Sequence, residues 1–239
     1  IARSVQDTRL MFEAMVGTDP RDPQSIDISN APTQPARSLR VAWSPRLGLD
    51  VPVDDDVRAC LQQGVERLRE AGWAIADTDP AWPADASEDA LMPLQHVGLA
   101  DLFGDEWKRD PTQFDADVAR QIERGLQWRG ADVARARQAG LQIALTLAEF
   151  HSRFDLLVCP TTPCVAWRND RLGPETIGGR PVEPRGHAVF TPFVNHAMAA
   201  AISIPCGRGR DGLPVGMQVI AARGRDRQLL DAAAEIEAV

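Results

Sequence analysis

The chain has 239 residues, of which 44% are hydrophobic and 25% charged, enough to bury the core of one large domain. Its formal net charge of −8 and pI near 5.0 argue against the basic face that a nucleic-acid-binding protein needs. No stretch reaches the roughly 18 apolar residues that span a bilayer, so we expect a cytoplasmic protein that acts on small molecules and binds neither nucleic acid nor membrane.

The first element is a helix, predicted over residues 5–16 from its apolar spacing and from Gly17, which supplies a stop. Residues 18–38 contain four prolines and no apolar periodicity, so they indicate a surface connection.

A strand, a helix and a second strand follow. Residues 39–43 and 73–76 are the predicted strands, and the helix between them begins at the acids Asp54–Asp56, where capping and the helix dipole favour negative charge. Its apolar face consists of Val57, Leu61, Val65 and Leu68. This order predicts a βαβ unit in a largely parallel sheet that helices cover.

Residues 87–154 are predicted to be mainly helical, with breaks at Pro93 and Pro111. The last helix of this region begins at Asp132. Its predicted apolar face carries Leu141, Leu145 and Ala148. A nearly continuous apolar strand over residues 155–159, buried on both sides, should follow.

A long loop rich in proline and glycine covers residues 160–184, and loops of this length are usually functional or disordered. Beyond it we predict a helix near 191–198, strands at 201–205 and 215–220, and a final helix from Asp226. The segment Gly207–Gly212 matches G-x-G-x-x-G, but a strand rather than a helix follows it. It therefore predicts a hairpin turn and not a phosphate site.

Few residues offer an independent nucleophile or a metal site. The four cysteines have neither disulfide-framework nor metal-ligand spacing and are interpreted as reduced core thiols. Burial at the end of a strand should raise the pKa of Cys159 and quench it, which leaves a cysteine hydrolase as a minor alternative. No G-x-S-x-G occurs, Ser203 is interpreted as a strand residue, and no histidine pair has metal-ligand spacing.

Three segments in one order resemble the amidase-signature family. Residues 2–23 resemble the helix and D-P-R-D-P turn that follow that family's catalytic region, and residues 155–163 resemble its D-x-L-x-x-P-T strand and loop. The third segment runs from Thr191 through Ala201–Gly207 to Ile220. Within this third segment Ala197–Ala201 departs from the family, which usually has T-G-x-P-A there, and the change should remove a tight backbone feature near the pocket.

The resemblance implies an α/β fold with a mixed central sheet between helices, and amide hydrolysis by a Ser, cis-Ser, Lys triad without a cofactor. The family's lysine and Gly-Gly-Ser-Ser-Gly loop lie before the matching segments. The only lysine here, Lys108, stands in a charged stretch. We therefore expect residues 1–239 to be the C-terminal portion of one amidase domain, with the catalytic N-terminal segment as its partner.

By position in the family, Thr191 and Asn195 are the leading candidates for substrate binding, with Thr161 and His187 as lesser ones. The alternative is that Thr191 caps a helix and Asn195 pins a turn through the backbone.

Two functions remain open. The first is the pocket-forming part of an amidase for a small carboxamide. The second is a non-catalytic remnant that acts as a binding or structural module. A homodimer is possible in either case, because a half-domain leaves sheet surface uncovered.

Overall fold

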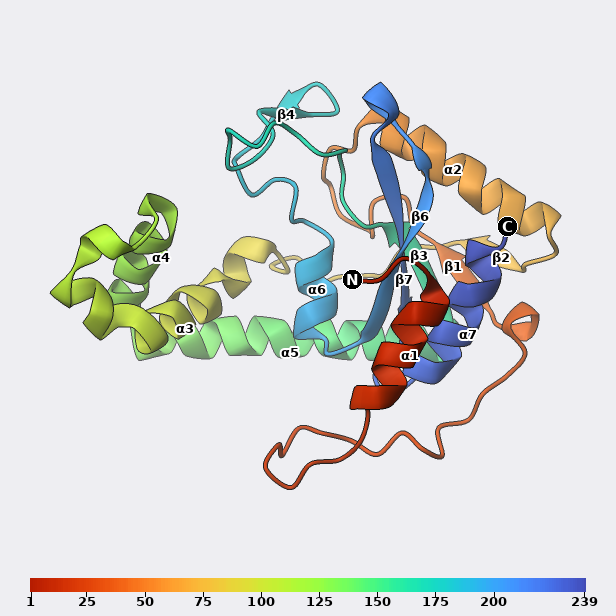
Figure 1. Ribbon diagram of the computed structural model, residues 1–239, viewed down its shortest axis with the longest axis horizontal. Helices are drawn as coiled ribbons and strands as arrows, with labels where there is room; N and C mark the ends of the chain where they lie inside the picture. Colours follow the sequence, from red (N-terminus) through yellow and green to blue (C-terminus); the bar gives the residue numbers. More distant parts are fainter. The chain divides into compact units, whose positions relative to one another are not determined.

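A mixed sheet of five strands lies at the centre of the larger of two units in the computed structural model, which describes residues 1–239 (Figure 1). The strands are β1 (Val41–Trp43), β2 (Ile75–Asp77), β3 (Leu156–Pro160), β6 (Ala200–Arg208) and β7 (Pro214–Ala221). They are ordered β2-β1-β3-β7-β6. β1 runs parallel to β2 and β3, and β7 runs antiparallel to β3 and β6. The predicted α/β fold with a mixed sheet is confirmed.

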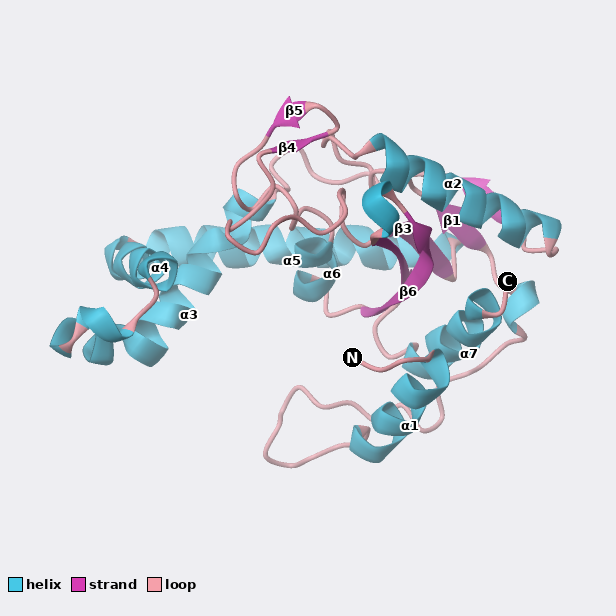
Figure 2. Ribbon diagram, turned by 45° about the horizontal axis from the view of Figure 1, so that its top comes forward, coloured by secondary structure: helices cyan, strands magenta, loops and turns pink.

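The larger unit comprises residues 1–81 and 147–239. Its helices are α1 (Val5–Met15), α2 (Asp55–Glu70), α6 (Thr191–His196) and α7 (Asp226–Glu237), with 3-10 turns at Ala36–Ser38 and Arg210–Gly212. In both ribbon views α2 and α7 lie on one side of the long strands and α6 on the other (Figures 1 and 2). None of the helices is long and apolar enough to cross a membrane.

The βαβ unit forms as predicted, with Val41 opposite Ile75 in the parallel pair β1 and β2. Its helix α2 has acids in the first turn and Arg67 and Arg69 in the last, which complements the helix dipole. The buried face of α2 includes Val57, Leu61, Val65 and Leu68, the four residues that the periodicity selected. Every residue of β3 is buried, as expected for a central strand.

The hairpin prediction for Gly207–Gly212 is also confirmed. β6 and β7 are antiparallel neighbours, and the 3-10 turn Arg210–Gly212 joins them. Within the long loop, the short strands β4 (Thr176–Ile177) and β5 (Arg180–Pro181) form a separate two-stranded hairpin.

The smaller unit, residues 82–146, is helical. It contains α3 (Glu88–Arg109), a 3-10 turn (Pro111–Gln113) and α4 (Ala116–Gln127), and α5 (Gly130–Arg153) continues from it into the larger unit. Ser87 caps α3 by accepting a hydrogen bond from the amide of Ala90, and Asp115 caps α4. Between the helices, the indole of Trp128 donates to Nδ1 of the buried His96 at 3.2 Å.

Of the two predicted helix breaks in this region, the one at Pro93 is wrong. Pro93 does not break the helix, because it is the sixth residue of α3 and is buried. The helix loses only the bond to the carbonyl of Asp89, close to its start, and the packed ring offsets that loss. Pro111, in contrast, stands just beyond the end of α3, where a break was predicted.

The prediction named the wrong side of α5 as the buried one. Leu141, Leu145 and Ala148 are exposed. The buried stripe instead carries Ala136, Ile143, Leu147 and Phe150. The helix has apolar residues on two stripes at 3.6-residue spacing, so periodicity alone does not select the one that is covered.

Candidate functional site

Two hydroxyl side chains meet where β3, β7 and β6 lie side by side. Thr161 directly follows β3, and its amide donates to the carbonyl of Gly216 in β7 at 3.0 Å. Its Oγ1 lies 2.6 Å from Oγ of Ser203 in β6. A Cβ at Gly216 would lie 2.7 Å from Ser203 Oγ and 2.8 Å from Thr161 Oγ1, so the hydroxyls can close over this position only because it is glycine.

This hydroxyl pair can bond a further polar group. Thr161 is half-buried and Ser203 is exposed. Each hydroxyl has one proton and two acceptor lone pairs, and the bond within the pair uses one proton. The pair therefore retains a donor and acceptors for a polar group such as a carboxamide. Sequence reasoning selected Thr161 but missed Ser203, because the two residues are separated by 42 positions and only the strand register joins them.

The two leading candidates lie on the short helix α6. Thr191 is its first residue, and the N-cap position belongs to Phe190, which has no capping side-chain hydrogen bond. The alternative role of Thr191 as a cap is therefore wrong. Asn195 is exposed, and its backbone carbonyl, rather than its side chain, accepts the bond from the Met198 amide that tightens the following turn.

That turn corrects the expectation for Ala197–Ala201. Met198, where the family usually has glycine, has φ +51°, a left-handed conformation that glycine adopts freely. The tight backbone feature is retained, and methionine adopts it at a steric cost.

Replacing Met198 with glycine is therefore expected to raise the free energy of unfolding by about 0.5–1 kcal/mol, since relief of left-handed strain exceeds the added entropy of the unfolded chain. Thermal unfolding measures the change. The matched control, Ala199→Gly, should lower stability by about 0.5–1 kcal/mol. Equal changes in thermal stability for the two variants would contradict the strain at Met198.

His187 lies just after the long loop of residues 160–184 and not at the hydroxyl pair. Its Nδ1 is 2.9 Å from the carbonyl oxygen of Pro184, and its ring centroid is 4.5 Å from that of Trp167. The long loop does line a cavity. A cavity of about 500 Å³ is lined by Trp167, Cys164, Arg171, Glu175, Asp54 and Arg210, among others. His187 does not line it.

Asp54 joins three segments around this cavity. Its side chain is buried and does not cap α2, in contrast to the prediction. One carboxylate oxygen accepts from the amide of Gly178 at 2.7 Å, and the other accepts from the guanidinium of Arg210 at 2.6 Å. The backbone amide of Asp54 donates to the carbonyl of Pro163. Asp54 thus fixes the long loop and the β6–β7 turn on the start of α2.

Three of the four cysteines are poor nucleophiles. All four are free, and only Cys60 is not buried. Burial raises the pKa of Cys159 to about 12 and those of Cys164 and Cys206 to about 11. These three thiols are protonated at neutral pH, which argues against a cysteine hydrolase built on any of them.

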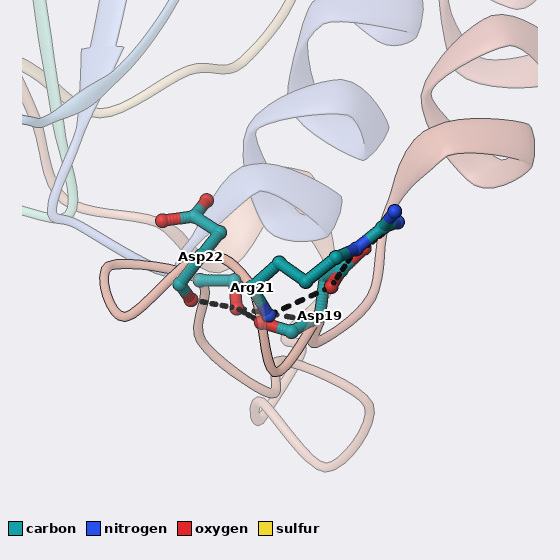
Figure 3. A network of polar contacts seen from close by, with 4 residues as sticks. Asp19, Arg21 and Asp22 are labelled. Carbon is teal, nitrogen blue, oxygen red and sulfur yellow. Dashed lines mark hydrogen bonds and ion pairs between the residues drawn. The ribbon is translucent and has the colours of Figure 1, made fainter.

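The D-P-R-D-P segment forms a turn that its own polar groups hold together (Figure 3). The carboxylate of Asp19 accepts from the backbone amide of Arg21 and from both sides of its guanidinium, and Ser25 donates its hydroxyl hydrogen to the carbonyl of Asp22. These bonds account for the segment as a structural turn.

Lys108 is exposed in the smaller unit and pairs with Asp105 at 3.6 Å. No group of three or more His, Cys, Asp or Glu side chains is placed to hold a metal ion.

Comparisons with known proteins agree with this fold. The family model described as Amidase matches residues 1–230. An acylamidase of Rhodococcus erythropolis is 32% identical over all of this chain and 51% of its own length. An amidase of Pseudomonas putida is 26% identical over 89% of this chain and 47% of its own.

Solved structures give the same result. A bacterial aryl acylamidase of the amidase signature family superposes with a TM-score of 0.86 at 22% identity, over 99% of this chain and 51% of that one. A 6-aminohexanoate cyclic dimer hydrolase superposes with a TM-score of 0.76 at 23% identity, over 99% and 53% of the two chains. The chain spans about half the length of the curated relatives it matches. It belongs to the amidase signature family.

Proposed function

We propose that this chain forms the substrate-pocket half of an amide-bond hydrolase that acts on a small carboxamide. The observation that carries the proposal is the match of residues 1–230 to the amidase family, together with relatives about twice as long as the region matched. In this proposal the Ser, cis-Ser, Lys triad comes from a catalytic N-terminal segment, which is the chain's partner. No cofactor takes part.

The hydroxyl pair of Thr161 and Ser203 is the proposed contact with the substrate amide. The two side chains lie on neighbouring strands, are open to solvent at Ser203, and keep hydrogen-bonding capacity outside their own 2.6 Å contact. A carboxamide has one acceptor oxygen and amide protons, which suits a group that can donate and accept at once. Thr191 and Asn195 remain proposed contributors to substrate binding, and His187 a lesser one.

The second candidate is a non-catalytic amidase-like module. The departure of Ala197–Ala201 from the family pattern favours it. The left-handed backbone at Met198 weakens that argument, because the turn at this position keeps the shape that glycine would give it.

Removing either hydroxyl tests the proposed contact. In the chain completed by the half of the Rhodococcus erythropolis acylamidase that it does not match, Thr161→Val and Ser203→Ala should each lower kcat/KM for a small amide roughly tenfold, the value of one lost hydrogen bond. Steady-state hydrolysis of acetanilide or benzamide measures the effect. The control, Ser152→Ala, removes an exposed hydroxyl of α5 that bonds only to a backbone carbonyl. Unchanged kcat/KM in both variants would show that the pair does not contact the substrate.

A further inference from the structure

Two cysteine thiols meet where helix α2 packs beside strand β6 (Figure 1). Cys60 belongs to α2 and Cys206 to β6, 146 positions apart along the chain. The Cys206 thiol donates a weak hydrogen bond to the backbone carbonyl of Cys60, with sulfur and oxygen 3.6 Å apart. The Cys60 thiol itself is close enough to raise the pKa of Cys206. The fold therefore brings together two cysteines that the sequence separates widely.

Glycines on both elements give the two thiols room to approach. A Cβ added to Gly64 of α2 would overlap the sulfur of Cys206. One added to Gly207 of β6 would lie 2.7 Å from the sulfur of Cys60, closer than carbon and sulfur can pack. Each thiol thus lies directly on the backbone of the opposite element. A larger residue at either glycine would push the helix and the strand apart.

The strand is irregular where it carries Cys206. Pro205 pairs with Gly216 of β7 and Gly207 pairs with Val215, so the residue between them has no partner in β7. An extra residue of this kind bends its strand locally and changes the direction of a side chain. Cys206 is therefore free of the β6–β7 pairing and can make the small movement that a bond between the two sulfurs requires.

The two thiols differ in their access to solvent. Cys60 is the one cysteine that is not buried, so a dissolved oxidant reaches it first. Burial raises the pKa of Cys206 to about 11, and the guanidinium of Arg67 offsets part of that rise. Nη2 of Arg67 also donates to the backbone carbonyl of Cys206 at 3.3 Å. An accessible thiol beside a second, shielded one is the arrangement that redox-sensitive cysteine pairs use.

We propose that Cys60 and Cys206 form a reversible disulfide within the chain when the protein meets hydrogen peroxide. The sulfur of Cys60 attacks one peroxide oxygen, the O–O bond breaks, and Cys60 becomes a sulfenic acid as one water leaves. The sulfur of Cys206 then attacks the sulfur of Cys60 and the S–O bond breaks. The departing hydroxide takes the proton of the Cys206 thiol and leaves as a second water. The two thiols lose two electrons and two protons, and one peroxide becomes two waters.

The disulfide would join α2 to the edge of the sheet, because β6 is the outermost strand and pairs only with β7. The same strand carries Ser203 of the hydroxyl pair, but the site does not depend on the proposed amide hydrolysis. A bond across 146 positions restricts the unfolded chain strongly. We therefore expect the oxidised chain to unfold roughly 5–10 °C above the reduced one. Thermal unfolding with and without dithiothreitol measures the difference.

Peptide mapping identifies the bond. The folded chain is treated with hydrogen peroxide, remaining thiols are alkylated with iodoacetamide in denaturant, and the unreduced digest is read by mass spectrometry. We expect a cross-linked peptide that joins Cys60 to Cys206 and disappears after dithiothreitol, with Cys159 and Cys164 alkylated. The control is the same chain oxidised in guanidinium chloride. There the shortest loop closes most easily, so Cys159 should pair with Cys164 instead.

Three results in the folded wild-type chain would overturn the proposal. Cys60 could stay open to alkylation, become a sulfinic acid while Cys206 stays reduced, or pair with a cysteine other than Cys206. The variant Cys206→Ser gives a second check, since Cys60 without its partner thiol should go on to the sulfinic acid under the same treatment. The matched variant Cys164→Ser should form the same cross-link as the wild type. Loss of the cross-link in a folded Cys164→Ser chain would also count against the pair.

Discussion

Replacing Gly125 with alanine is expected to lower the free energy of unfolding of the smaller unit by roughly 3 kcal/mol. Gly125 lies in α4 where that helix crosses α3. A Cβ there would lie 2.1 Å from the backbone carbonyl oxygen of His96 and 2.7 Å from Cβ of Ala100. Because the nearest atom belongs to a helical backbone, the two helices must separate to admit one methyl group.

The same substitution elsewhere in the unit should have the opposite effect. Gly98 is an exposed residue of α3, and a Cβ added there would meet no atom within 4 Å. Gly98→Ala should therefore raise stability by about 0.5–1 kcal/mol through helix propensity alone. Hydrogen exchange of the α3 and α4 amides, read by mass spectrometry, compares the two variants. If the α3 and α4 amides exchange no faster in the Gly125→Ala variant than in the wild type, α3 and α4 do not pack this closely.

The elements that depend on a single strong pattern were predictable from the sequence. The four-residue stripe of α2, the continuous apolar run of β3 and the strand after Gly207–Gly212 each had one interpretation, and each is confirmed. Local propensity and burial agree at these places, so the sequence specifies them without tertiary information.

The errors occurred where two local patterns compete or where tertiary packing decides. α5 carries two apolar stripes, and only the fold selects the buried one. Pro93 opposes a helix locally but is buried inside α3. Asp54 has the position and chemistry of a helix cap, yet its carboxylate bonds Gly178 and Arg210, which lie more than 120 residues away along the chain.

The candidate site shows the same limit. Thr161 and α6 could be selected from motifs, whereas Ser203 belongs to the site only because β6 and β7 place it beside Thr161. The φ of Met198 was equally hidden, since the residue type suggested that the tight turn was lost.

The largest expected change in amide hydrolysis comes from adding the catalytic half of an amidase to this chain. The chain has no Gly-Gly-Ser-Ser-Gly loop, its three buried cysteines are protonated at neutral pH, and its one lysine is exposed in an ion pair. Neither the three buried thiols nor Lys108 therefore has the setting of a nucleophile or base of the proposed triad. In the proposed assembly that triad would act beside the hydroxyl pair, and enzymes of ordinary efficiency exceed the uncatalysed rate by about 10⁶-fold or more.

The most direct test is hydrolysis of small amides by the chain alone and by its 1:1 complex with the half of the Rhodococcus erythropolis acylamidase that it does not match. Intact mass fixes the composition of each sample, with about 26.1 kDa expected for the chain itself. We expect turnover by the complex and none by the chain. Turnover by the chain alone, or a stoichiometric complex that hydrolyses no amide, would contradict the proposed division of the amidase into a catalytic half and a pocket-forming half.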